Sequence, residues 1–95
     1  MKHRADTVQA AIVAALRGTG HSVQILSQVG DGTPDLLVGR NRLNILLETK
    51  TGAGKLSARQ AIWHKEWKGQ VATVWDVPDA LEAVNYAVKQ QGRGR

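Results

Sequence analysis

The chain has 95 residues, enough for one domain around a single hydrophobic core. Thirteen Lys and Arg against eight Asp and Glu give a net charge of +5, which favours a polyanionic partner such as nucleic acid. Cysteine is absent, which excludes disulfide frameworks and thiolate metal sites. No apolar run is long enough to span a membrane and no secretory signal opens the chain, so we expect a cytoplasmic protein without a membrane partner.

The first expected element is a helix that starts at Asp6 and ends at Gly18. Asp6 is a suitable N-cap, and Gln9 stands three residues later, where it would complete a capping box. Apolar residues recur at spacings of three and four, which predicts one buried stripe made of Val8, Ala11, Ile12, Ala15 and Leu16.

Three strands are expected next. Residues 21–27 alternate as in a short half-buried strand, and 28–34 form a loop rich in glycine. Two apolar runs follow, residues 36–39 and 43–47, separated by Arg40-Asn41-Arg42. This spacing predicts a β-hairpin.

The second half of the chain alternates between helix and strand. After a flexible connection at 51–55, the pattern predicts a helix over 57–68 and a strand over 71–75. Pro78 starts a last helix, and the polar tail 90–95 is expected to fray. The element order is therefore α-β-β-β-α-β-α in one domain of residues 1–95. It predicts an α/β (α+β) fold with a mixed central sheet flanked by helices.

Charged residues mark the same end of both hairpin strands. Asp35 precedes the first strand, and Glu48 and Lys50 follow the apolar part of the second, two residues apart and so on one face. A carboxylate placed where a buried strand ends must be paired or bind a metal. This cluster suits a hard divalent ion with oxygen ligands, Mg²⁺ or Mn²⁺.

These residues resemble a known family. Pro34-Asp35 followed by Glu48-Thr49-Lys50 is the signature of the PD-(D/E)XK nucleases, which have a restriction-endonuclease-like fold. The flanking segments GDGTPDLLVGR, LLETK and KLSARQAIWHKEWKGQ resemble the VRR-NUC (virus-type replication-repair nuclease) domain, especially its small stand-alone phage and prophage members. The resemblance runs from about Arg4 to Ala83. It implies the same element order, a divalent metal and cleavage of DNA.

The resemblance also implies roles for single residues. Asp35, Glu48 and the Thr49 carbonyl would be metal ligands, Lys50 the charged catalytic group, and Gln60 the glutamine that the family places on the helix after the motif. One departure is on the first helix, where the family commonly has an acid that helps to hold the metal. Gln9 is the nearest polar residue here and would ligate weakly through its amide oxygen or through water.

Some side chains have a structural alternative. Gln60 has capping-box spacing with Ser57, and capping would compete with a position at the site. Gln9 has the same alternative, with capping favoured. Trp63 and Trp67 lie at helical spacing on a face that should pack on the sheet, so we expect them in the core rather than stacked on bases.

The expected function is a Mg²⁺- or Mn²⁺-dependent DNA endonuclease, similar to Holliday-junction resolvases. It would act as a homodimer on branched DNA such as four-way junctions, in the cytoplasm of a bacterial or phage-infected cell. The alternative is a nucleic-acid-binding module of the same fold with weak or lost catalysis, because the first-helix acid is missing. DNA would be held by cations around the site, namely Arg40, Arg42, Lys55, Arg59, Lys65 and Lys68, with Arg93 and Arg95 in the tail.

Overall fold

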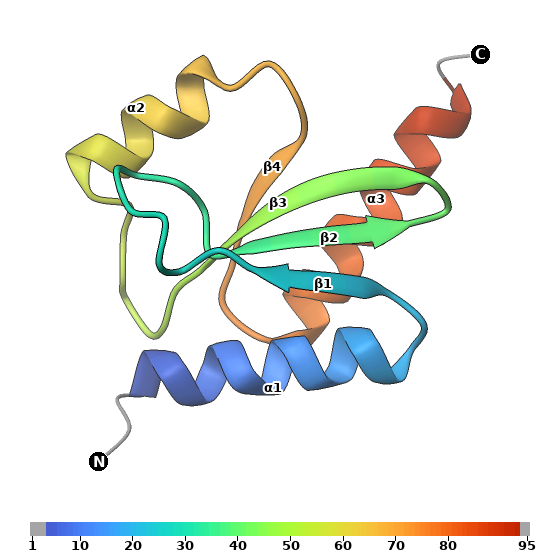
Figure 1. Ribbon diagram of the computed structural model, residues 1–95, viewed down its shortest axis with the longest axis horizontal. Helices are drawn as coiled ribbons and strands as arrows, with labels where there is room; N and C mark the ends of the chain where they lie inside the picture. The colour runs from blue at the N-terminus through green and yellow to red at the C-terminus, as the bar shows by residue number, and fades with distance from the viewer. Residues whose placement is uncertain (1–3, 94–95) are drawn as a thin grey trace.

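A computed structural model of the chain describes the backbone of residues 4–93 and the side chains of residues 7–92. Its element order is the predicted α-β-β-β-α-β-α (Figure 1). The elements are α1 (Arg4–Gly18), β1 (Ser22–Ile25), β2 (Leu36–Arg40), β3 (Leu43–Thr49), α2 (Ala58–Glu66), β4 (Val71–Val74) and α3 (Val77–Arg93).

The four strands form one mixed sheet in the order β1-β2-β3-β4. The first three are antiparallel, and β4 pairs parallel to β3, as a helix crossover between the two strands requires. The predicted hairpin is confirmed: Arg40 pairs with Leu43, and the turn residues Asn41 and Arg42 have φ of 51° and 66°. Two positive φ values identify the turn that matches the twist of a two-residue hairpin.

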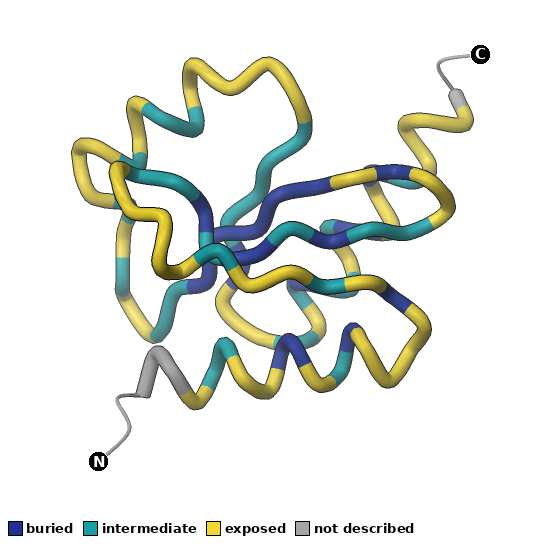
Figure 2. Tube along the Cα trace, viewed as in Figure 1, coloured by how far each residue is buried: buried dark blue, intermediate teal, exposed yellow. Residues whose placement is uncertain are grey.

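Two helices cover one face of the sheet. Alternate strand residues such as Leu36, Val38 and Leu47 point toward α1 and α3 and are fully buried. The buried segments of the strands, α1 and α3 meet at the centre of the molecule (Figure 2). The shorter α2 stands apart from both, over one end of the sheet (Figure 1). The candidate site lies at this end.

The first helix differs from the prediction in its start and in its buried stripe. It already includes Arg4, so Asp6 lies inside its first turn and is not the N-cap. Ile12 and Leu16 are buried as expected, but Val13 is buried beside them and Ala11 is exposed. Val13 lies on the side of α1 that faces β1, where it lines a small cavity together with Ile25.

The second helix is the largest departure. Trp63 and Trp67 were expected in the core, but α2 contains no buried residue and Trp67 is 46 % exposed. The two indoles instead stack on each other, with ring centroids 4.5 Å apart. The helix ends at Glu66 rather than at Lys68 because Trp67 has extended backbone angles. A nine-residue helix at the sheet end has too little sheet beneath it to bury both rings.

The last helix is longer than predicted. It begins at Val77, where the carboxylate of Asp76 accepts a hydrogen bond of 2.8 Å from the Asp79 N–H, as an N-cap does. It continues to Arg93, so the expectation of a frayed tail from Gln90 is wrong for residues 90–93. The side chains of Arg93 and Arg95 lie outside the described residues. No helix within residues 4–93 is long and apolar enough to cross a membrane.

This packing predicts unequal costs for truncating two aliphatic side chains. Leu36→Ala removes a fully buried side chain from beneath α1 and α3 and should destabilise the protein by about 2–5 kcal/mol in urea unfolding. Ile62→Ala, on α2, removes a side chain that is 57 % exposed and should cost about 0.5 kcal/mol or less. Equal losses for the two variants would show that α2 belongs to the core.

Candidate functional site

The open end of the β2–β3 hairpin brings Asp35 to Glu48. Leu36 pairs with Leu47, so one further step along this antiparallel register places Asp35 opposite Glu48, on the same face of the sheet. The Asp35 carbonyl accepts a hydrogen bond of 2.7 Å from the Leu26 N–H, which fixes its backbone. Asp35 Oδ2 accepts two hydrogen bonds of 2.8 Å, from the backbone N–H and the hydroxyl of Thr49. The carboxylate is therefore held at the end of β3.

Glu48 is the most buried charged residue of this cluster, with only 2 % of its surface exposed. Its Oε2 lies 3.3 Å from the amide nitrogen of Gln60 and 3.7 Å from the ammonium nitrogen of Lys50. Its other oxygen, Oε1, is buried and has no hydrogen-bond partner among the described residues. A buried carboxylate oxygen without a donor is costly, and a cation would satisfy it.

The surroundings of Glu48 raise its pKa from 4.5 to about 8. Burial is the largest cause, and the negative charge of Asp35 adds to it. Lys50 lowers the pKa but does not offset these effects, although its distance from Glu48 is that of an ion pair. Glu48 therefore holds a proton at neutral pH, and a divalent cation could replace that proton.

Lys50 and Gln60 complete the exposed side of the cluster. The Lys50 backbone N–H donates to the Val74 carbonyl at 2.9 Å, which fixes Lys50 just beyond β3. The Lys50 ammonium group donates to Gln60 Oε1 at 2.8 Å. The same oxygen accepts the Ser57 N–H at 2.9 Å, so Gln60 closes the predicted capping box and faces the site at once. Capping and site-facing were expected to compete, yet one side chain does both.

Gln9 reaches the back of the cluster from α1. Its amide nitrogen donates to the Ser27 hydroxyl at 3.0 Å, and its oxygen lies 3.2 Å from the Thr49 hydroxyl. Gln9 therefore does not cap α1, contrary to the favoured expectation. The Thr49 hydroxyl has one proton and lies between Gln9 and Asp35. The sequence predicted a role only for the Thr49 carbonyl and none for its hydroxyl group.

The expected ring of cations is only partly present. Arg40 and Arg42 lie at the hairpin turn, a full strand length from Asp35 and Glu48, so the expectation that they surround the site is wrong. Arg40 instead donates to the Thr19 carbonyl at 3.0 Å. The cations on or next to α2 are exposed, namely Lys55, Arg59, Lys65 and Lys68, and Arg59 pairs with Asp31 at 3.3 Å.

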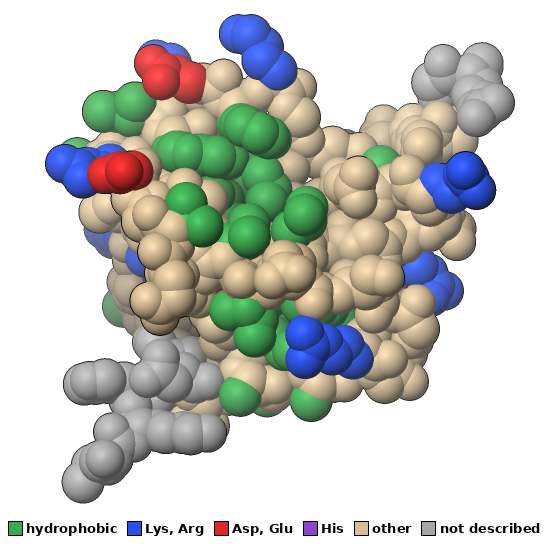
Figure 3. Space-filling model, in the orientation of Figure 1, with side chains coloured by type: hydrophobic (Ala, Val, Ile, Leu, Met, Phe, Trp, Pro, Cys, Tyr) green, Lys and Arg blue, Asp and Glu red, His purple; other side chains and the backbone are tan. Residues whose placement is uncertain are grey.

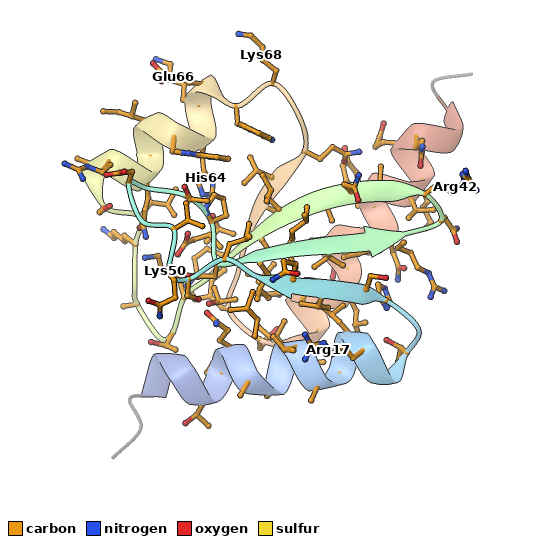
Figure 4. The ribbon with its side chains drawn as sticks, in the orientation of Figure 1. Arg17, Arg42, Lys50, His64, Glu66 and Lys68 are labelled. Carbon is orange, nitrogen blue, oxygen red and sulfur yellow. The ribbon has the colours of Figure 1, made fainter. Side chains whose placement is uncertain are left out.

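The sequence also gave no role to His64. The imidazole lies beneath α2 on the side that faces the sheet, with Lys50 below it (Figure 4). Its pKa is lowered from 6.5, first by burial and then by the charge of Lys50. The signal for this placement was its position between Gln60 and Trp67 on the helix.

The oxygen atoms that could bind a metal ion at this site suit a hard cation, but they are few. Within the described residues no group of three or more His, Cys, Asp or Glu side chains could hold a metal ion. Two carboxyl groups, with the amide oxygen of Gln9 nearby through Thr49, are the available side-chain oxygens. Mg²⁺ is commonly held by one or two carboxylates with water and substrate phosphate, so this set fits it.

Comparison with family models, with characterised proteins and with solved structures finds no match to this chain.

The pKa of Glu48 predicts that, without a divalent ion, stability falls as the pH rises from about 5 to 8. The folded state keeps a proton on Glu48 that the unfolded state releases near its ordinary pKa of 4.5. Folding therefore becomes less favourable by up to about 1.4 kcal/mol per pH unit in this window. Urea unfolding in EDTA at several pH values measures this slope.

Glu48→Gln should flatten this slope because an amide does not titrate. Glu66→Gln replaces an exposed acid of α2 and is the matched control that keeps the slope. The same pH profile in wild type and Glu48→Gln would contradict the raised pKa.

Proposed function

We propose that the protein is a metal-dependent DNA endonuclease of VRR-NUC type that hydrolyses phosphodiester bonds. The observation that carries this proposal is the meeting of Asp35 and Glu48, from neighbouring strands, with the Lys50 ammonium group 3.7 Å from Glu48. Within the described residues Glu48 Oε1 is buried without a hydrogen-bond partner, and the pKa of Glu48 is raised to about 8, so a bound cation would stabilise this carboxylate. An ordinary surface ion pair shows neither feature.

In this proposal Asp35 and Glu48 hold Mg²⁺ or Mn²⁺, with the Thr49 carbonyl as a further ligand and Gln9 contributing through water. A divalent ion bound there supplies Lewis acidity to the phosphate and lowers the pKa of a bound water. The two hydrogen bonds from Thr49 hold the Asp35 carboxylate in a fixed orientation beside Glu48.

Lys50 is proposed to act on the phosphate. Its side chain is 19 % exposed, so the ammonium group is accessible yet held by Gln60 Oε1 at 2.8 Å. A fixed cation beside the reacting phosphate stabilises the negative charge that builds up on it in the transition state. Gln60 joins Lys50 to Glu48 and so keeps the ammonium group near the carboxyl pair.

DNA is proposed to approach along α2. The exposed cations near the site belong to this helix and its flanking segments, namely Lys55, Arg59, Lys65 and Lys68. Contacts from such residues go mostly to phosphates and carry little sequence information. Arg40 and Arg42, at the far end of the hairpin, would reach DNA only if it extends along the sheet.

The finer parts of the proposal rest on the resemblance. They are a preference for branched DNA such as a four-way junction, a homodimer that places two sites on two strands, and action in the cytoplasm of a bacterial or phage-infected cell. None of them is needed for the chemistry at one site.

One observation favours a second candidate, a nucleic-acid-binding module with weak or lost catalysis. Where the family commonly has an acid on the first helix, this chain presents Gln9, whose amide binds Ser27 and Thr49. A neutral amide adds no charge to the donor set, so the affinity for a divalent ion would be lower than with a third carboxylate.

Cleavage of a labelled four-way junction in Mg²⁺ or Mn²⁺ tests the proposal. Asp35→Asn removes a proposed ligand charge and should abolish cutting. Lys50→Ala should lower the cleavage rate by about 100-fold or more, the usual cost of losing one group that stabilises transition-state charge.

Two variants serve as matched controls for this cleavage assay. Glu66→Gln and Lys89→Ala change exposed residues of α2 and α3 and should cut at the wild-type rate. Metal-dependent binding of DNA without any cleavage by the wild type would support the second candidate. Normal cutting by Asp35→Asn would contradict the proposed mechanism.

A further inference from the structure

An unassigned cavity of about 640 Å³ lies along the outer edge of β4, between α2 and α3. Its floor is made by β4 residues such as Val71 and Thr73. Hydrophobic side chains gather in the hollow beneath α2 and the segment that leads to β4 (Figure 3). The volume lies in the range of sites that bind small molecules or single groups.

Three exposed aromatic side chains from different segments line this cavity. Trp67 follows α2, Trp75 follows β4 and Tyr86 lies on α3, and they are 46 %, 40 % and 64 % exposed. Trp67 is held in place by its stack on Trp63, and Trp75 by a hydrogen bond of 3.4 Å from its indole to the Gly54 carbonyl. Fixed, solvent-exposed aromatic faces are what a flat ring needs in order to stack.

The charged residues around the cavity favour an aromatic ring over a phosphate as its occupant. No Lys or Arg is among the residues that line it, while Asp79 and Glu82 stand on its α3 side. These carboxylates would repel a phosphate and accept hydrogen bonds from amino groups. Lys68 stands between Trp67 and Gly69, which both line the cavity, and projects outward at the end of α2 (Figure 4). A phosphate is therefore favoured at the α2 rim, outside the cavity.

The cavity adjoins the candidate catalytic cluster through His64. This side chain lines the cavity and is close enough to Lys50 for the charge of Lys50 to act on it. A chain of nucleotides that places one phosphate at Lys50 could therefore place a neighbouring base beside His64. No comparable aromatic surface lines the other cavities found among the described residues.

We infer that this cavity binds a single unpaired nucleobase, stacked against Trp67 and Tyr86, while the adjoining phosphates lie at Lys68 and Lys50. This inference rests on the proposed function and names the substrate class more closely: DNA with an unpaired base beside the scissile phosphate. An unpaired base enters such a pocket at a lower cost than a paired base, which must first leave the duplex. The cavity thus provides selectivity for branch points and bulges over continuous duplex.

A strand from another chain is the competing occupant of this edge. In a parallel pair, alternate residues point their backbone groups away from the neighbour, so those of Val71 and Thr73 face outward. A second copy paired antiparallel here would bring Glu82 of each copy to the same side of the joined sheet. Like charges would then face each other, so the base is the better occupant.

The test compares two DNA duplexes that differ in one group. Both carry a one-nucleotide bulge, which holds 2-aminopurine in one duplex and an abasic residue in the other. Binding is measured by anisotropy without added divalent ion, so that it does not depend on cleavage. We expect the base-bearing bulge to bind about tenfold more tightly, with quenching of the 2-aminopurine fluorescence by the indole.

Variants on two separate elements are tested, so that the result does not depend on whether one of them folds. Trp67→Ala and Tyr86→Ala should each reduce the ratio of the two affinities to below about threefold. Ile62→Ala, an exposed apolar residue of α2 that does not line the cavity, should retain the full ratio. If Trp67→Ala unfolds, Tyr86→Ala still decides the outcome.

The other outcomes each overturn the inference. Equal affinity for the two bulges, with normal cleavage of the four-way junction, would contradict the base pocket but not the proposed function. Failure to bind either DNA, together with no cleavage of the four-way junction in Mn²⁺, would contradict both the inference and the proposed function. A dimer in light scattering that Tyr86→Ala dissociates, together with equal affinities, would assign the edge to a second copy instead.

Discussion

The structure depends on a buried carboxyl group, that of Glu48, which lies beside the half-buried Asp35 at the end of the sheet. Glu48 has almost no exposed surface, and the antiparallel register of β2 and β3 places Asp35 opposite it. Such a pair is stabilised by a proton or by a cation, because a buried carboxylate is repelled by a second negative charge beside it. Because its pKa is raised, Glu48 keeps a proton at neutral pH. In the proposed function, Mg²⁺ or Mn²⁺ takes the place of this proton.

The position of α2 follows from the same pair. The helix has no buried residue, and the side chain of Gln60 joins it to both Glu48 and Lys50. Gln60 also closes the capping box with Ser57. One amide side chain therefore contacts both the first turn of α2 and the carboxyl group of Glu48. Loose packing leaves Trp67 exposed beside the β4 edge, where the inferred base pocket lies.

The sequence was sufficient to predict the element order and the position of Asp35 beside Glu48. Alternating apolar runs and a two-residue turn defined the hairpin, and the hairpin register alone brings Asp35 to Glu48. Features set by packing between distant segments were not predictable. The placement of Trp63 and Trp67 depended on how much sheet lies beneath α2, and Val13 is buried on the side of α1 that faces Ile25 of β1. Gln9 was assigned to capping because its partners, Ser27 and Thr49, are distant in sequence.

Calorimetric titration with Mn²⁺ is the most direct measurement of whether the carboxyl pair is a cation site. The account predicts one ion per chain, bound more tightly at about pH 8 than at pH 6 because the ion must displace the proton of Glu48. Asp35→Asn should remove this binding and Glu66→Gln should leave it unchanged. Absence of binding at millimolar Mn²⁺, or equal binding by wild type and Asp35→Asn, would contradict the account.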